Sequence, residues 1–95
     1  MPTKITEIED KERSKTILRV EGSLAEEDAL LLERIALDLR EHNGHDLTLD
    51  LADLHFIDSD SAPIIKRLQY EHGFEIEGLQ IFLQKIVEET AKRPG

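Results

Sequence analysis

Two segments near the start of the chain mix hydrophobic and polar residues in the manner of short strands. Residues 4–9 carry isoleucines among polar residues, and residues 15–21 are richer in β-branched side chains. The charged residues 10–14 between them are typical of a turn. The pattern therefore predicts an antiparallel hairpin that ends at Gly22.

A long amphipathic helix is expected next. Ser23 and Glu26 form a Ser-x-x-Glu capping box, in which each side chain can satisfy a backbone N–H of the other residue. Apolar residues then recur at intervals of three and four, which places them on one stripe of a helix. Asn43-Gly44 supplies the residue that ends it. The stripe consists of Leu24, Leu31, Leu32, Ile35, Ala36 and Leu39.

The rest of the chain alternates between strands and helices. Leucine alternates strictly with polar residues over 46–51, which predicts a strand with one buried face. A connection over 52–60 leads to a helix over 62–72, and a short strand follows at 74–77. A third amphipathic helix is expected to begin at Leu79. Its apolar residues are Leu79, Phe82, Leu83, Ile86 and Val87.

The element order ββαβαβα predicts the fold class. Strands separated by helices favour parallel pairing through crossover connections. We therefore expect a small α/β sandwich with a mixed four-stranded sheet and its helices on one face. Ninety-five residues bury a single core, so residues 1–95 are expected to form one domain. The tail 91–95 should fray, because Pro94 and Gly95 cannot extend a helix.

Composition restricts the function classes. The net charge of −9 repels phosphates, so no nucleic acid partner is expected. The longest apolar run, residues 29–32, is far below the roughly 20 residues of a membrane span, so no membrane insertion is expected. The chain has no cysteine, and its N-terminus lacks an apolar signal core. These features together favour a cytoplasmic location.

The densest cluster of polar residues is the segment 55–63, which leads into the second helix. Proline is tolerated only in the first turn of a helix, so Pro63 requires the cap to be Asp60 or Ser61. Two interpretations follow. The loop either caps the helix and does nothing more, or it forms a partner or phosphate site at a helix N-terminus.

The segment Leu49-Asp50-Leu51-Ala52-Asp53-Leu54-His55-Phe56-Ile57-Asp58-Ser59 resembles the central signature of the STAS domain family. Val20-Glu21-Gly22-Ser23-Leu24 is similar to the turn that leads into the first helix of that family. The resemblance extends over residues 17–89. It implies a regulatory domain like the anti-sigma factor antagonists, which act by binding another protein.

The resemblance also assigns roles within the loop. Asp58 and Ser59 match the Asp and first Ser of the family's Asp-Ser-Ser-Gly motif. Asp60 occupies the phosphoacceptor serine position, and Ser61 replaces the glycine. Asp60 therefore either imitates a phosphorylated state with its fixed charge or caps the helix, and we favour the cap. Ser59 and Ser61 keep hydroxyl groups that could be phosphorylated.

The function expected from these residues is non-enzymatic docking to a protein partner. The partner is a kinase-like anti-sigma factor or a transporter ATPase; as alternatives, the chain is an accessory subunit of an ABC-type lipid transporter or a small-molecule-sensing module. No catalytic residues, cofactor or metal are expected, because His42 and His45 lack a third ligand on a rigid element. The expected docking loop comprises Phe56, Asp58, Ser59, Asp60 and Ser61, and the expected docking helix face comprises Lys66, Arg67 and Gln69.

Overall fold

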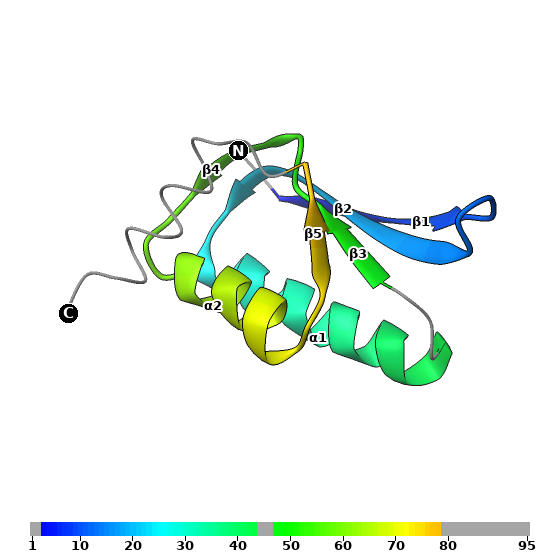
Figure 1. Cartoon of the computed structure of the whole chain (residues 1–95). Helices are drawn as coiled ribbons and strands as arrows, with labels where there is room; N and C mark the ends of the chain where they lie inside the picture. The colour runs from blue at the N-terminus through cyan, green and yellow to red at the C-terminus, as the bar shows by residue number, and fades with distance from the viewer. Residues whose placement is uncertain (1–2, 44–46, 79–95) are drawn as a thin grey trace.

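A computed structural model describes residues 3–43 and 47–78 of the chain (Figure 1). These residues form five strands, two α-helices and one π-helical segment. In chain order the elements are β1 (Lys4–Asp10), β2 (Lys15–Leu24), α1 (Glu26–Asn43), β3 (Leu47–Asp50), β4 (Leu54–Ile57), α2 (Ala62–Lys66), η1 (Arg67–Glu71, the π-helical segment) and β5 (Glu75–Glu77).

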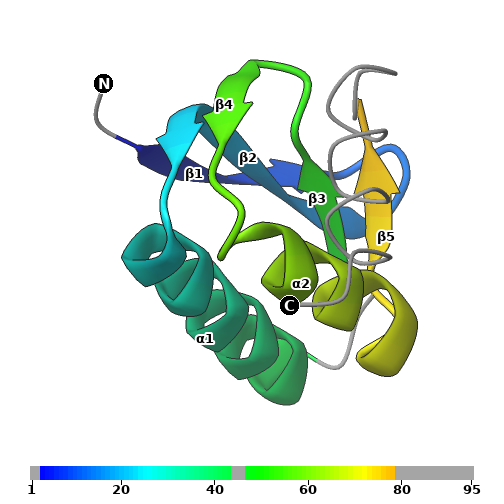
Figure 2. The same ribbon diagram turned by 90° about the vertical axis from the view of Figure 1, so that its left-hand side faces the viewer.

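The strands form one mixed sheet in the order β1-β2-β3-β5. β1 is antiparallel to β2, whereas β2, β3 and β5 run parallel to one another. β4 pairs in parallel with the last residues of β2, beyond the point where β3 ends. Helices α1 and α2 cover the same face of the sheet (Figures 1 and 2). The expected fold class, a mixed α/β sheet with helices on one face, is confirmed.

The fifth strand lies in a segment that the sequence pattern assigned to a connection. β4 follows no period of two, because Leu54 and Ile57 are buried while His55 and Phe56 are exposed. Its partner β2 does not end at Gly22 as expected but continues to Leu24. The pairing register shifts between Gly22 and Ser23, and Gly22 has a φ of 89°. Glycine adopts that conformation at little cost, so the strand passes through it.

Helix α1 begins at Glu26, so the interpretation of Ser23 as its cap is wrong. Ser23 belongs to β2 and pairs with Phe56 of β4. The apolar stripe is also partly wrong, because Leu31 is 49% exposed. The face of α1 that packs on the sheet carries smaller side chains than expected. Its fully buried residues are Ala29, Leu32 and Ala36.

The core lies between the two helices and strands β2 and β3. The expected burial of the leucines over 46–51 is confirmed, since Leu47, Leu49 and Leu51 are all buried. The other face is not wholly exposed, however, because Thr48 is also fully buried, and residue 46 lies outside the described residues. β3 lies between β2 and β5, so it is an interior strand with neighbours on both sides. Removing these side chains from water is the main term that stabilises the sheet against the helices. The other core residues include Leu18, Val20, Leu24, Ile57, Ile64, Ile65, Leu68 and Phe74.

The second helix has the expected start but changes type within its length. It is α-helical over Ala62–Lys66 and continues as a π-helix over Arg67–Glu71. The third helix, expected from Leu79 onward, and the tail 91–95 lie outside the described residues.

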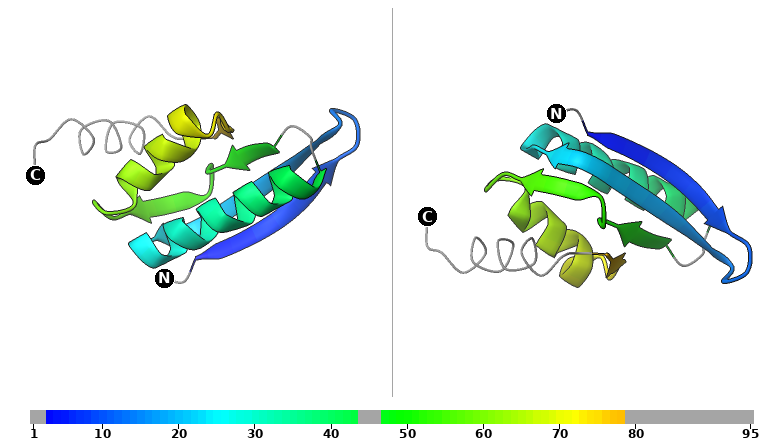
Figure 3. Two further views of the ribbon diagram at one scale, coloured as in Figure 1. Left: turned by 90° about the horizontal axis from the view of Figure 1, so that it is seen from below. Right: turned by 90° about the horizontal axis from the view of Figure 1, so that it is seen from above.

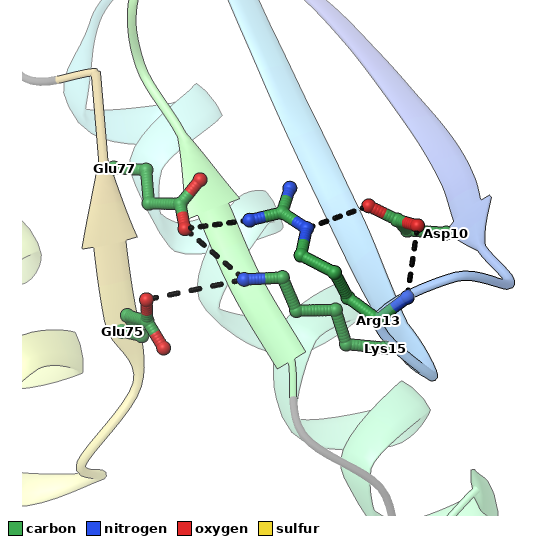
Figure 4. A network of polar contacts seen from close by, with 5 residues as sticks. All are labelled: Asp10, Arg13, Lys15, Glu75 and Glu77. Carbon is green, nitrogen blue, oxygen red and sulfur yellow. Dashed lines mark hydrogen bonds and ion pairs between the residues drawn. The ribbon is translucent and has the colours of Figure 1, made fainter.

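The face of the sheet opposite the helices carries charged side chains that cross from one strand to another (Figure 4). Lys15 reaches over β3 and places its Nζ 3.0 Å from Oε1 of Glu77. Arg13, at the hairpin tip, has its Nε 2.8 Å from Oδ2 of Asp10 and one terminal nitrogen 3.5 Å from the same oxygen of Glu77. The hydrogen bond from Lys15 holds the pKa of Glu77 below its ordinary value. The hairpin is thereby tied to β5.

Candidate functional site: the loop between β4 and α2

The side chain of Asp58 accepts most of the hydrogen bonds that organise the loop between β4 and α2. Its Oδ1 accepts hydrogen bonds from the backbone N–H of Ser61 at 2.8 Å and lies 2.6 Å from the hydroxyl oxygen of Ser61. Its Oδ2 accepts the backbone N–H of Glu26 at 3.3 Å. Glu26 is the first residue of α1, so Asp58 supplies an acceptor for the start of α1 as well as for the start of α2. One carboxylate therefore joins the N-terminal ends of both helices.

Backbone contacts fix the same loop to the end of β2. The N–H of Asp58 donates to the carbonyl oxygen of Leu24 at 3.1 Å, and the N–H of Ser61 donates to that of Asp58 at 3.2 Å. Leu24 is the last residue of β2 and is fully buried. The base of the loop is thus anchored in the core, which restricts how its exposed residues move.

Ser61 occupies the N-cap position of α2, which is one of the two alternatives left open by the sequence. Pro63 lies in the first turn, as the sequence required. The side chain of Ser61 does not cap its own helix, however. Its hydroxyl is fully buried and lies 3.0 Å from the carbonyl oxygen of Leu24 in addition to the oxygen of Asp58. Because the hydroxyl has a single proton, it donates to one of these acceptors at a time.

The electrostatics of the loop keep Asp58 ionised. Burial acts to raise the pKa of Asp58, but the hydrogen bonds from Ser61 and from the amide of Glu26 outweigh it. The pKa therefore lies below the ordinary value for aspartate. The carboxylate stays an acceptor at neutral pH, as its structural role requires.

Three of the five expected loop residues are exposed and two are not. Phe56 is 58% exposed, and Ser59 and Asp60 are also exposed. The side chain of Asp60 makes no hydrogen bond or ion pair with any residue in the described part of the chain, whereas its backbone N–H is one of the donors that lower the pKa of Asp58. Asp58 and Ser61 instead anchor the loop through hydrogen bonds to each other, to Leu24 and to Glu26. The structure therefore separates an exposed group, which we call the loop tip (Phe56 of β4 with Ser59 and Asp60 of the loop), from the half-buried Asp58 and the buried Ser61.

The expected docking face of the second helix is already partly engaged within the chain. The guanidinium group of Arg67 forms a two-point ion pair with Glu33 of α1, at 2.5 Å and 2.6 Å. Lys66 places its ammonium group 5.0 Å from the ring centre of Tyr70, and Gln69 is half-buried. Lys66 and Gln69 keep partly accessible side chains, whereas Arg67 binds the two helices together.

Glu33 anchors a second tie between the helices that the sequence pattern did not predict. Besides Arg67, it lies 3.2 Å from Nε2 of His72. Arg40 donates a hydrogen bond to the carbonyl oxygen of His72, and its guanidinium carbon lies 4.3 Å from the ring centre of Phe74. These contacts fix the far end of the α2–η1 segment, as Asp58 fixes its beginning.

Glu33→Gln is expected to remove a contribution to stability that depends on pH. The hydrogen bond from Arg67 lowers the pKa of Glu33 below its ordinary value of 4.5. A carboxyl group with a lowered pKa contributes stability above its unfolded pKa and loses it as the pH falls through the folded value. Because Arg67 is partly exposed, we expect a loss of about 1–2 kcal/mol near pH 7. Urea unfolding should show this difference narrowing in acid below about pH 4.

Glu41→Gln provides the control for this measurement, since Glu41 is exposed on the same helix. It should leave the free energy of unfolding unchanged, both near pH 7 and in acid below about pH 4. A loss for Glu33→Gln that stays the same in acid would show that the ion pair with Arg67 is not its source.

The described residues also bear on metal binding and on membrane insertion. Residues 3–43 and 47–78 contain no group of three or more His, Cys, Asp or Glu side chains placed to hold a metal ion. Over the same ranges, no helix combines the length and hydrophobicity that crossing a membrane requires.

Comparison with known proteins identifies the fold. No family model and no curated protein matches the chain. Among solved structures, it is similar to an antisigma-factor antagonist STAS domain from Rhodobacter sphaeroides, with 22% identity, a TM-score of 0.53, and coverage of 78% of this chain and 82% of that one. It is also similar to the anti-sigma factor antagonist SpoIIAA in its unphosphorylated form, with 10% identity, a TM-score of 0.50, and coverage of 95% and 100%.

A third similar structure belongs to a larger protein, Mglu. The identity is 25% and the TM-score 0.50, over 66% of this chain. The chain spans only 16% of the length of Mglu. The two anti-sigma factor antagonist structures show that the chain has the fold of STAS domains and of SpoIIAA.

Proposed function

We propose that this chain is a non-enzymatic regulatory domain that binds another protein through the loop tip. The supporting observation is the contrast between neighbouring residues of β4 and of the loop that follows it. Phe56 of β4 is 58% exposed and Ser59 and Asp60 of the loop are exposed, while Asp58 and Ser61 anchor that loop to the core. An exposed aromatic side chain on a paired strand, next to a well-anchored loop, suits protein recognition, because little conformational entropy is lost on binding.

The partner that we propose is a kinase-like anti-sigma factor, in a cytoplasmic setting. The similarity in fold to two anti-sigma factor antagonists supports this class. A transporter ATPase is the other partner class that the sequence features fit, and the binding experiment below separates the two. Lys66 and Gln69, on the helix that follows the loop, extend the proposed contact surface.

Phosphorylation is not required in this proposal. Asp60 stands at the position that the resemblance gives to the phosphoacceptor serine, and it carries a fixed negative charge. Ser61 is fully buried, so a kinase has no access to its hydroxyl in the folded domain. Ser59 is the one exposed serine of the loop. We therefore propose that the unphosphorylated loop tip is the form that binds the partner.

Phe56→Ala is expected to weaken partner binding at least tenfold, which corresponds to about 1.4 kcal/mol. The variant should fold normally, because the side chain is mostly exposed. The measurement is titration calorimetry against a purified kinase-like anti-sigma factor and, separately, a purified transporter ATPase from the same genome.

Leu31→Ala is the matched control, since Leu31 is another exposed apolar residue, at 49%, but lies on α1. It should bind as the unchanged protein does. Equal losses for Phe56→Ala and Leu31→Ala would argue against the loop tip as the contact. If only the ATPase bound, and Phe56→Ala weakened that binding, the loop tip would stand as the contact surface but the proposed partner class would be wrong.

A further inference from the structure

In the part of the chain that the structure describes, β1 is an edge strand whose outer side pairs with no other strand. Among the described residues it pairs with β2 alone, through seven consecutive residue pairs without a bulge. Figure 3 shows β1 along the outer margin of the sheet, with no other described element beyond it. No proline interrupts Lys4–Asp10. An edge of this kind presents backbone N–H and C=O groups that can pair with another strand.

The side chains along this edge have a definite charge pattern. Glu7 and Glu9 are two residues apart, so they lie on the same face of β1, and both are exposed. Ile8, between them, lies on the opposite face, where it is half-buried beside Ile17 of β2. Within the edge, the segment Glu7-Ile8-Glu9 is therefore acidic, aliphatic, acidic.

The net charge of the chain disfavours a second copy as the added strand. An antiparallel copy centred on Glu7 would place Glu7 opposite its own equivalent, and a parallel copy in register would do the same for both glutamates. One antiparallel register, with Lys4 opposite Glu9, avoids these pairs, so the general repulsion between copies is the main argument against self-pairing. Like charges placed opposite each other across strands are destabilising, and the net charge of −9 adds a general repulsion between copies.

We infer that the β1 edge accepts an extended segment of another protein with the pattern basic, aliphatic, basic. Side chains directly opposite on paired strands approach within about 4.5–5.5 Å, so two Lys or Arg residues would face Glu7 and Glu9. The aliphatic residue between them would cover the exposed part of Ile8. The backbone of the edge supplies affinity, and the two carboxylates select the charge.

This surface is separate from the loop tip and shares none of its residues. Its partner segment therefore need not belong to the protein that binds the loop. A failure at the β1 edge leaves the proposed function untouched, and the reverse also holds.

The test uses a labelled, end-capped peptide of alternating lysine and valine, and a second peptide of alternating glutamate and valine. We expect the lysine peptide to bind and to slow amide hydrogen exchange within β1. The double variant Glu7→Lys/Glu9→Lys should bind the lysine peptide at least tenfold more weakly. It should also gain binding of the glutamate peptide. Fluorescence anisotropy measures the affinities, and NMR detects the protected amides.

The double variant Glu27→Lys/Glu41→Lys is the control, because it changes the net charge by the same amount on the exposed face of α1. It should keep the affinity of the unchanged protein to within about twofold. Equal weakening in the two double variants would overturn the inference in favour of general charge attraction. Absence of lysine-peptide binding, or protection outside β1, would also overturn it.

Discussion

Leu49→Ala is expected to destabilise the folded domain by about 2–5 kcal/mol, the largest effect of any change considered for this chain. Leu49 is 0% exposed and lies in the interior strand β3, opposite Leu18 of β2 and Ile76 of β5. Truncation removes buried methyl groups and leaves a cavity between the sheet and the helices. Thermal unfolding should shift down by about 10 °C or more, since each kcal/mol moves the midpoint by about 4–8 °C in a domain of this size.

Leu31→Ala makes the same chemical change where little packing is lost, because Leu31 is 49% exposed on α1. Alanine also favours helix, so the cost of this control should stay below about 1 kcal/mol. Similar denaturation midpoints for the two variants would contradict the placement of Leu49 in the core.

Asp58→Ala is expected to cost about 2–3 kcal/mol, which is a large loss for a loop residue. The change removes the acceptor for the N–H of Glu26 and for the N–H and hydroxyl of Ser61. The N–H and hydroxyl of Ser61 keep backbone acceptors in Asp58 and Leu24, so what is lost is the stronger bonding to a charged acceptor. Hydrogen bonds to charged groups contribute about 1.5–3 kcal/mol, and a lost helix cap costs about 1 kcal/mol. Urea unfolding monitored by circular dichroism measures the loss.

Asp60→Ala is the matched control for this prediction. It removes the same kind of side chain two residues further along the chain, where the carboxylate is exposed. We expect a change below about 0.5 kcal/mol. If Asp60→Ala cost as much as Asp58→Ala, the carboxylate of Asp58 could not be the specific tie between the two helices.

The strongest sequence patterns predicted the fold because they depend on local periodicity. Leucine at every second position from 47 to 51 can place one face in the core only as a strand. β4 has no such period, since its buried residues are Leu54 and Ile57, and a register shift in β2 accommodates it. A four-residue strand of this pattern cannot be told from a loop by period alone.

The sequence predicted where the loop before the second helix lies, but not how its residues contact the rest of the domain. A polar cluster before Pro63 was enough to locate the start of a helix. The contacts of Asp58 with Leu24 and Glu26, however, join segments more than thirty residues apart, and no local pattern reports them. The capping box at Ser23 failed for the same reason, because tertiary pairing with β4 extended the strand through it.

The most direct test of the docking proposal is a map of the partner's footprint on the domain. Amide NMR shifts of the isotope-labelled domain would be followed as the partner identified by calorimetry is added. The account predicts that the largest changes fall on Phe56, Ser59 and Asp60, with smaller ones along α2. Changes confined to the exposed face of α1 around Leu30 and Leu31, with the loop tip unaffected, would contradict it.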